Sequence, residues 1–193
     1  MAIALATYAL IDDVTYAAVA GAPDASDLDK LHFLANAASA RMEAYTRRFL
    51  RSRDLTQYLD GTGTSRLVVP VRPINSITTL NADASRAFAA ATDMAASEYR
   101  FLPDPGIIEL FSGTFPCAIG SVKLVCNAGF AETHEKYPIL QTACIELMLH
   151  NLKRFAGNVG VRSISGADGM NTALEIDMPL NVRLALDEFR DPA

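Results

Sequence analysis

Small and apolar residues recur three or four positions apart over residues 28–49, the clearest periodic pattern in the chain. This spacing places them on one face of an α-helix of about 22 residues, roughly 33 Å long at 1.5 Å per residue. Ser26 or Asp27 is suited to cap its start. Such a stripe suits either a coiled-coil seam or packing within one domain, and we favour the second. The recurring positions are Leu28, Leu31, Ala35, Ala38, Met42, Tyr45 and Phe49.

Three further helices are predicted from the same spacing. Thr7 is a candidate cap for a short helix that runs to about Ala20, after which glycine and proline interrupt the pattern. Residues 138–156 are apolar over so wide an arc that this helix is expected at the centre of the core. A last short helix is expected within residues 179–190.

Between residues 54 and 130 the pattern changes to short runs with the two-residue alternation of β-strands. Gly61-Thr62-Gly63 is interpreted as a hairpin turn, because it lacks the third glycine of a dinucleotide loop and the Gly-Lys-Ser/Thr of a P-loop. The alanine-rich stretch Ala82–Ala96 is predicted to be a loop or a short helix. Six strands are expected, at Leu55–Leu59, Arg66–Val71, Ile74–Leu80, Glu98–Leu102, Ile107–Phe111 and Ser121–Asn127.

These elements predict an α+β fold, a mainly α-helical bundle of about four helices with an inserted antiparallel β-rich subdomain. The length of 193 residues fits one domain. A flexible arm is expected before the last helix, because that stretch is rich in glycine and serine and has few apolar anchors. The expected parts are N-terminal helices in 1–53, the β-rich insertion in 54–130, the central helix in 138–156, the arm in 157–178 and the C-terminal helix in 179–190.

Composition narrows the class of protein. Half of the residues are hydrophobic and 20% are charged, which excludes disorder throughout. A chain of this length buries about 70% of its extended surface, so its core needs neither a metal nor a disulfide. Three widely spaced cysteines fit a reducing compartment, and no apolar run approaches the roughly 18 residues of a membrane span. We therefore expect a soluble, intracellular protein with no membrane partner.

Charge is unevenly distributed along the chain. Residues 30–72 carry eight basic and three acidic side chains, a local charge of +5, whereas the remainder carries −10. A molecule with one basic and one acidic part is suited to contact a phosphate backbone, or the acidic part of an identical neighbour, through its basic part. Solvated helix and strand faces would produce the same distribution. The eight basic residues are Lys30, Arg41, Arg47, Arg48, Arg51, Arg53, Arg66 and Arg72.

Catalytic and metal chemistry find little support in the sequence. The three histidines have no nucleophile-elbow sequence near them, so we expect no enzyme, and an unrecognised hydrolase is the weakest alternative. The cysteines and His134 provide no pair at the two-to-four-residue spacing of a metal knuckle. Cys126 and Cys144 are interpreted as small hydrophobic residues of the core. We expect no catalytic residue, no metal and no cofactor. The sequence positions considered are His32, His134, His150, Cys117, Cys126 and Cys144.

One polar cluster is a candidate site: Arg47, Arg48, Arg51 and Arg53, at the end of the long predicted helix. Arg47 and Arg51 are four residues apart and would share a helix face. Their guanidinium groups would contact acidic residues of a neighbouring subunit or DNA phosphates. The negative end of the helix dipole favours the same placement without any function. No base-reading motif accompanies the cluster, so sequence-specific DNA binding is not expected. A small intracellular nucleic-acid-binding module that uses this cluster is kept as the alternative function.

Several short motifs follow one another in an order that resembles the head–tail connector proteins of tailed bacteriophages, also called adaptor or head completion proteins. The motifs lie at 38–49, 58–63, 67–77, 125–130 and 178–190, so that the resemblance covers nearly the whole chain. Each motif is structural and none is catalytic; their shared order carries the resemblance. The alanine-rich stretch and the large β region depart from many relatives.

The resemblance implies a ring of identical subunits, commonly twelve, under the portal protein of a DNA-filled head, where it offers the tail a platform. It also implies portal and tail or tail-completion proteins as partners, nonspecific contact with packaged DNA, and a place at the head–tail junction of the virion after assembly in the host cytoplasm. A closed ring needs two different complementary surfaces on each subunit, and the unequal charge could supply them. The arm would fold against a neighbour or the portal on assembly. Its residues are Ser163, Ile164, Ser165, Gly166, Asp168 and Gly169.

Overall fold

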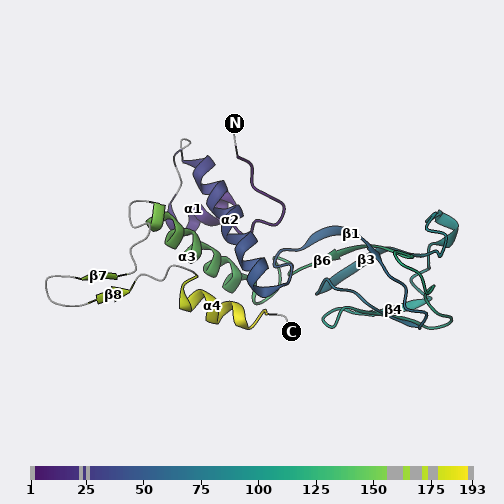
Figure 1. Cartoon of the computed structure of the whole chain (residues 1–193). Helices are drawn as coiled ribbons and strands as arrows, with labels where there is room; N and C mark the ends of the chain where they lie inside the picture. The colour runs from purple at the N-terminus through teal and green to yellow at the C-terminus, as the bar shows by residue number, and fades with distance from the viewer. Residues whose placement is uncertain are drawn as a thin grey trace. The chain divides into compact units, whose positions relative to one another are not determined.

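The chain forms two compact units (Figure 1) in a computed structural model that describes residues 3–21, 24, 27–155, 163–165, 171–173 and 178–190. The helical unit joins Met1–Leu50 to Glu135–Ala193, and the β unit comprises Arg51–His134. The expected α+β class is confirmed. A mainly α-helical bundle is not, because the strands form a compact unit of their own.

The first helix differs from its predicted start, and the second begins where predicted but without the expected side-chain cap. α1 (Asp13–Ala20) is capped by Asp12, whose carboxylate accepts a hydrogen bond from the Thr15 N–H at 2.7 Å. Thr7 is therefore not the cap, and residues 7–12, predicted to be helical, are not. α2 (Leu28–Thr46) begins after Asp27 as predicted, but the Asp27 carboxylate accepts from the Lys30 ammonium, at 2.7 Å, instead of capping the backbone.

Residues 3–11, here called the N-terminal strap, lie along a polar stripe on α2. Ser39 accepts a hydrogen bond from the Leu10 N–H at 3.0 Å, and both residues are buried. Asn36 binds the strap through both halves of its amide, accepting from Ala6 N–H and donating to Ala4 O, each at 2.9 Å. The stripe satisfies strap backbone groups that no helix or strand pairs, and it places Leu10 and Ile11 in the core. Its members, spaced three or four residues apart, are Asp29, His32, Asn36 and Ser39.

His32 gives the strap a pH dependence. Its Nδ1 lies 2.6 Å from the Ile3 carbonyl oxygen and its Nε2 lies 2.9 Å from Asp13 Oδ1. The hydrogen bond to Ile3, followed by the carboxylates of Asp13 and Asp29, raises the pKa of His32 above its ordinary value, against the opposing effect of burial. Protonated His32 therefore contributes stability that is complete below about pH 6.5 and is lost as pH rises through the raised pKa. Thermal unfolding from about pH 5 to 9 should show this loss in the wild type and not in His32→Gln. A parallel pH dependence in both proteins would contradict it.

α3 (Tyr137–Phe155) is central in the helical unit, as predicted, and contacts both α2 and α4 (Leu180–Asp187). α4 buries Val182 and Leu186. It runs antiparallel to the first half of α3, where Lys136 pairs with Glu188 and Asn181 donates to Glu146. The α3 residues with side chains at most 3% exposed are Tyr137, Leu140, Ala143, Cys144, Leu147 and Met148. None of the helices that the structure describes is long and apolar enough to cross a lipid bilayer.

All six predicted strands of the β unit are present, in two antiparallel three-stranded sheets. In the first sheet, β6 (Val122–Ala128) lies between β1 (Arg53–Leu59) and β3 (Ile74–Ala82). In the second, β5 (Ile107–Leu110) lies between β2 (Arg66–Val68) and β4 (Tyr99–Leu102). Within the alanine-rich stretch a single 3-10 turn, η1 (Ala90–Thr92), is formed.

The segment around Gly61 is not the predicted hairpin turn. β1 and β2, which it connects, belong to different sheets, so it crosses from one sheet to the other. Glycine is required because the backbone passes the 116–121 loop closely: a Cβ at Gly61 would lie 1.8 Å from the Pro116 carbonyl oxygen. The Gly61 N–H donates to Ala118 O at 3.0 Å, and Asp60 accepts from the Gly120 N–H at 2.7 Å.

Part of the expected arm is described. β7 (Ser163–Ser165) pairs antiparallel with β8 (Asn171–Ala173), with Ile164 opposite Thr172. The expected arm residues Gly166, Asp168 and Gly169 lie outside the described residues. The arm's role in assembly stays a prediction.

Candidate assembly surfaces

The predicted arginine cluster does not lie on one helix. α2 ends at Thr46, so Arg47 and Arg51 do not share a helical face, and that prediction is wrong. Arg47 and Arg48 belong to the helical unit, whereas Arg51 and Arg53 belong to the β unit. Arg47 is exposed and takes a left-handed backbone conformation, with φ of 57°.

The early end of α2 has a tertiary cause. Leu50 is fully buried, and its N–H donates to the Glu43 carboxylate at 3.1 Å. Thr46 donates through its hydroxyl to the Met42 carbonyl at 2.9 Å. The Arg47 N–H closes the last helical turn on Glu43 O at 2.8 Å. A helix continuing to residue 49 would carry Leu50 away from this buried position.

Arg51 is engaged within its own unit. Its guanidinium group lies 2.8 Å from the Glu132 carboxylate, and the two side chains are 26% and 66% exposed. Arg53 starts β1, opposite Ala128 of β6. The Arg51–Glu132 pair links the segment before β1 to the segment after β6, within the β unit.

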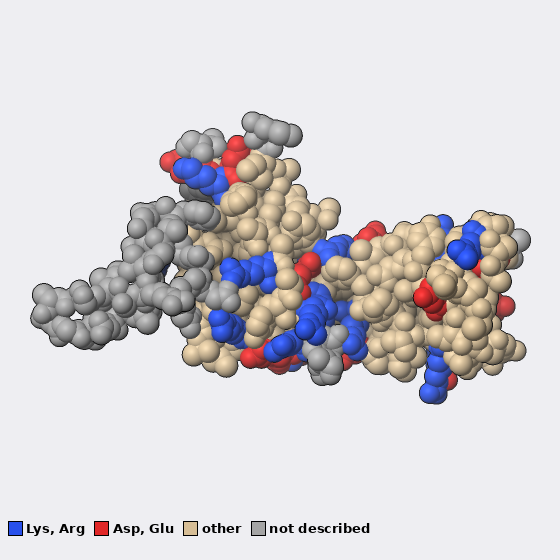
Figure 2. Space-filling view, viewed as in Figure 1, with Lys and Arg blue, Asp and Glu red and all other residues tan. Residues whose placement is uncertain are grey.

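A second charged cluster, which the sequence analysis missed, lies between α2 and α4. The Tyr45 hydroxyl donates to Asp187 at 2.7 Å, and the Arg190 guanidinium lies 5.5 Å from the centre of the Tyr45 ring. The bond to Asp187 raises the pKa of Tyr45, while the positive charges of Arg190 and Arg183 oppose that shift. Figure 2 shows Lys and Arg side chains gathered over α4 and the end of α2. The spacing of Arg183, Asp187 and Arg190 on the last predicted helix was the one sign of this cluster in the sequence. Only the fold brings Tyr45 to them.

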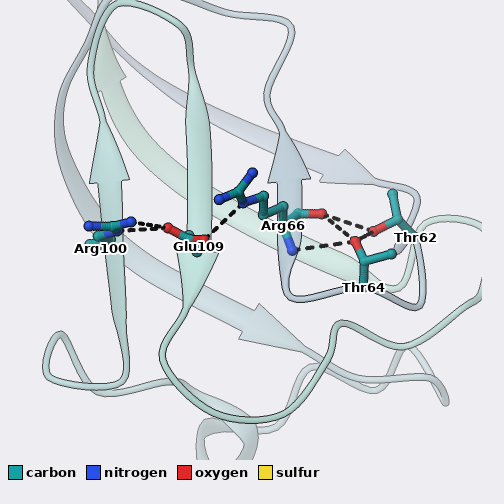
Figure 3. Close-up of polar contacts among 5 residues, drawn as sticks. All are labelled: Thr62, Thr64, Arg66, Arg100 and Glu109. Atoms are coloured by element: carbon teal, nitrogen blue, oxygen red, sulfur yellow. Dashed lines mark hydrogen bonds and ion pairs between the residues drawn. The ribbon is translucent and has the colours of Figure 1, made fainter.

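The β unit presents a row of alternating charges across its second sheet (Figure 3). Glu109, on the central strand β5, accepts from Arg66 Nε at 2.8 Å and from Arg100 Nε at 2.7 Å. The two arginines lower the pKa of Glu109. The hydroxyls of Thr62 and Thr64 donate to the Arg66 carbonyl at 3.0 and 2.9 Å, which holds the start of β2 in place.

Among the described residues, no three His, Cys, Asp or Glu side chains are grouped so that they could hold a metal ion. Cys126 and Cys144 are buried, as predicted, and burial raises the pKa of Cys144 to about 12. Cys117 is exposed. The polar groups brought together are ion pairs and backbone anchors, which suit binding surfaces.

The architecture of the described residues, four helices with two small three-stranded antiparallel sheets inserted between them, is shared with chains solved in gene transfer agent particles. The chain matches a chain solved in the virion of a native gene transfer agent (GTA) particle, with a TM-score of 0.65 and 20% identity, over 100% of this chain and 95% of the other. It also matches chains of two GTA necks. One, from a native particle with C12 symmetry, has a TM-score of 0.59 and 22% identity over 85% of this chain and 83% of the other. The other, from an empty particle with C6 symmetry, has a TM-score of 0.58 and 24% identity over 90% and 82%.

No family model and no curated protein matches the sequence. The likeness is therefore one of fold. The likeness supports the resemblance to head–tail connector proteins that the sequence motifs indicated, because chains of this fold occur in the neck of GTA particles.

Proposed function

We propose that this protein is a structural head–tail connector subunit, which forms a ring of identical copies in the neck of a phage-related particle. The observation that carries the proposal is the match of fold, over most of both chains, to neck components solved with C12 and C6 symmetry. In this proposal the chain acts through assembly and carries no catalytic residue. The ring lies under the portal, commonly with twelve copies, and offers the tail a platform.

In this function the arginine cluster and the arm make different contacts. Arg47, Arg48, Arg51 and Arg53 contact acidic groups of a neighbouring subunit or the phosphates of packaged DNA. The arm at 157–178 folds against the next subunit or the portal when the ring forms. Arg51 already binds a carboxylate, that of Glu132 at 2.8 Å, which supports contact of this cluster with acidic groups.

The full-length chain is expected to form closed rings with cyclic symmetry at high concentration. Native mass spectrometry would give the copy number, and class averages from negative-stain electron microscopy would give the symmetry. A chain that stays monomeric up to its solubility limit would overturn the connector proposal. Salt-dependent binding of duplex DNA by such a monomer would instead favour the nucleic-acid-binding module.

A further inference from the structure

β1 lies at the edge of its sheet and is paired on one side only. Its seven residues run antiparallel to β6, and no other strand that the structure describes lies beside it (Figure 1). The register is continuous from Arg53 to Leu59, and the five residues after Asp54 carry no charge and include no proline. A regular, uncharged edge strand lacks the features by which proteins prevent pairing with a further strand. This edge of the β unit can therefore accept another strand.

The remaining strand edges of the β unit are shorter, irregular or partly covered. β3 has two register shifts in its pairing with β6. Its other side is partly occupied, because the Met94 N–H donates to Leu80 O at 2.8 Å and Asn81 forms a bridge with Asp93. β2 and β4, the edges of the second sheet, are three and four residues long. Among the described strands, β1 is therefore the longest edge that is both regular and uncovered.

The outward-facing backbone groups of β1 follow from the hydrogen bonds at the two ends of β6. The Asp83 N–H donates to Ser121 O at 2.8 Å, and the Gly129 N–H donates to Pro73 O at 2.9 Å, so both odd-numbered ends of β6 bind the side of β3. Because backbone groups alternate in direction along a strand, the even-numbered residues of β6 bind the odd-numbered residues of β1. The residues of β1 whose N–H and C=O groups point outward are Asp54, Thr56 and Tyr58.

A second β element with unpaired edges occurs in the same chain. β7 and β8 pair with each other and with neither of the two sheets, so each keeps a free edge within the described part of the chain. A two-stranded pair is marginally stable on its own in water, and further strands stabilise it. The sequences of the two strands, Ser-Ile-Ser and Asn-Thr-Ala, are uncharged, as is the edge of β1. Like-charge repulsion therefore does not oppose their pairing with that edge.

The edge of β1 and the β7–β8 pair are unlike surfaces that every copy of the chain carries. β1 belongs to the β unit, and β7 and β8 belong to the helical unit. When a strand adds to an edge, main-chain hydrogen bonds supply the affinity, so no special side chain is required. A contact between two unlike surfaces repeats from copy to copy and can close into a ring. These properties favour a second copy of this chain as the partner of the β1 edge.

We propose that the β7–β8 pair of one subunit adds to the free edge of β1 in the next subunit. The three-stranded sheet and the two-stranded pair then form one sheet of five strands. The inference rests on the proposed connector function, and it names the surface against which the arm folds. The outward N–H and C=O of Thr56 lie at the centre of this contact.

Thr56→Pro tests the edge and leaves the ladder between β1 and β6 intact. Because the Thr56 N–H points outward, proline removes a hydrogen bond that only an added strand would use, and edge positions of this kind tolerate proline. Its ring also lies where the added strand would pass. The variant should therefore need a roughly tenfold or higher protein concentration for half of the chains to assemble, as measured by native mass spectrometry.

Val68→Pro is the matched control for Thr56→Pro. Val68 is 66% exposed on the edge strand β2, and its N–H points outward because the next residue, Val69, binds Gly106 O through its own N–H at 2.7 Å. This control should assemble like the wild type, and circular dichroism would confirm that both variants are folded. If both variants assemble equally well, the β1 contact is overturned, while rings of the wild type would still support the connector proposal.

Cross-linking between two differently labelled copies identifies the occupant. One chain carries Thr56→Cys and the other carries Thr172→Cys in β8, each with Cys117→Ser to remove the exposed thiol. Since each chain has one of the two positions, a thiol cross-linker can join them only between copies. Strands lie about 4.8 Å apart, so a linker of about 10 Å reaches β8 whether β7 or β8 is adjacent to β1. A covalent heterodimer is expected, and Val68→Cys in place of Thr56→Cys should give none.

The two measurements separate failure of this contact from failure of the proposed function. Rings without the cross-link would overturn the β1 contact and leave the connector proposal standing. A defect of Thr56→Pro without the cross-link would mean that another strand occupies the edge, which also overturns the inference. The cross-link in a chain that forms no ring would support the contact and overturn the connector proposal. If neither rings nor the cross-link form, both are wrong.

Discussion

Gly61→Ala is expected to destabilise the β unit by more than about 3 kcal/mol, the upper range for forcing atoms into a packed site. The new Cβ would lie 1.8 Å from the Pro116 carbonyl oxygen and 2.6 Å from Ser121 Oγ, and a backbone carbonyl cannot rotate away as a side chain can. Moving the 116–121 loop would break the bond that the Gly61 N–H donates to Ala118 O and the bond that Asp60 accepts from the Gly120 N–H. Chemical denaturation followed by circular dichroism would measure the loss of free energy of unfolding.

Gly113→Ala is the matched control for Gly61→Ala. Gly113 has a φ of 80° but open space around it, so alanine there introduces backbone strain and no collision. A cost of about 1–2 kcal/mol is expected. If Gly61→Ala is no more destabilising than Gly113→Ala, close approach to Pro116 is not the reason for glycine at position 61.

Ser39→Ala is expected to destabilise the helical unit by about 1–3 kcal/mol, the cost of leaving a buried donor unsatisfied. The Leu10 N–H donates to Ser39 Oγ at 3.0 Å, and both residues are buried. The Ser39 hydroxyl also lies 3.6 Å from Cys144 Sγ, in the buried interior between α2 and α3. Thermal unfolding would report the loss of stability. Hydrogen exchange should become faster at the Leu10 amide in particular.

Thr142→Ala is the matched control for Ser39→Ala, because it removes a hydroxyl from the same unit without leaving a buried group unpaired. Thr142 is exposed on α3 and donates to the Pro138 carbonyl one turn earlier. Its loss leaves no buried donor unpaired, and a change within about 0.5 kcal/mol is expected. Equal effects of Ser39→Ala and Thr142→Ala would show that the N-terminal strap does not depend on Ser39.

The sequence predicted secondary structure correctly where a single hydrophobic periodicity runs through the whole element. β6 alternates buried and half-exposed residues from Val122 to Ala128, so its strand character is explicit in the sequence. α3 is apolar over a wide arc because it contacts two helices, and its central place could be predicted. The candidate site was predicted less well. Its four arginines were expected at the end of one long helix, but α2 ends at Thr46, before all of them.

By itself, the amino-acid sequence determined where helices and strands form, because hydrophobic periodicity over neighbouring residues selects the backbone conformation that buries them. Only the tertiary structure decided how the segments end and what their polar groups contact. Tyr45 meets Asp187 across 142 residues, Ser39 holds Leu10, and Gly61 passes Pro116. These contacts join residues far apart in the chain, and their free energy depends on burial that exists only after the whole unit has packed.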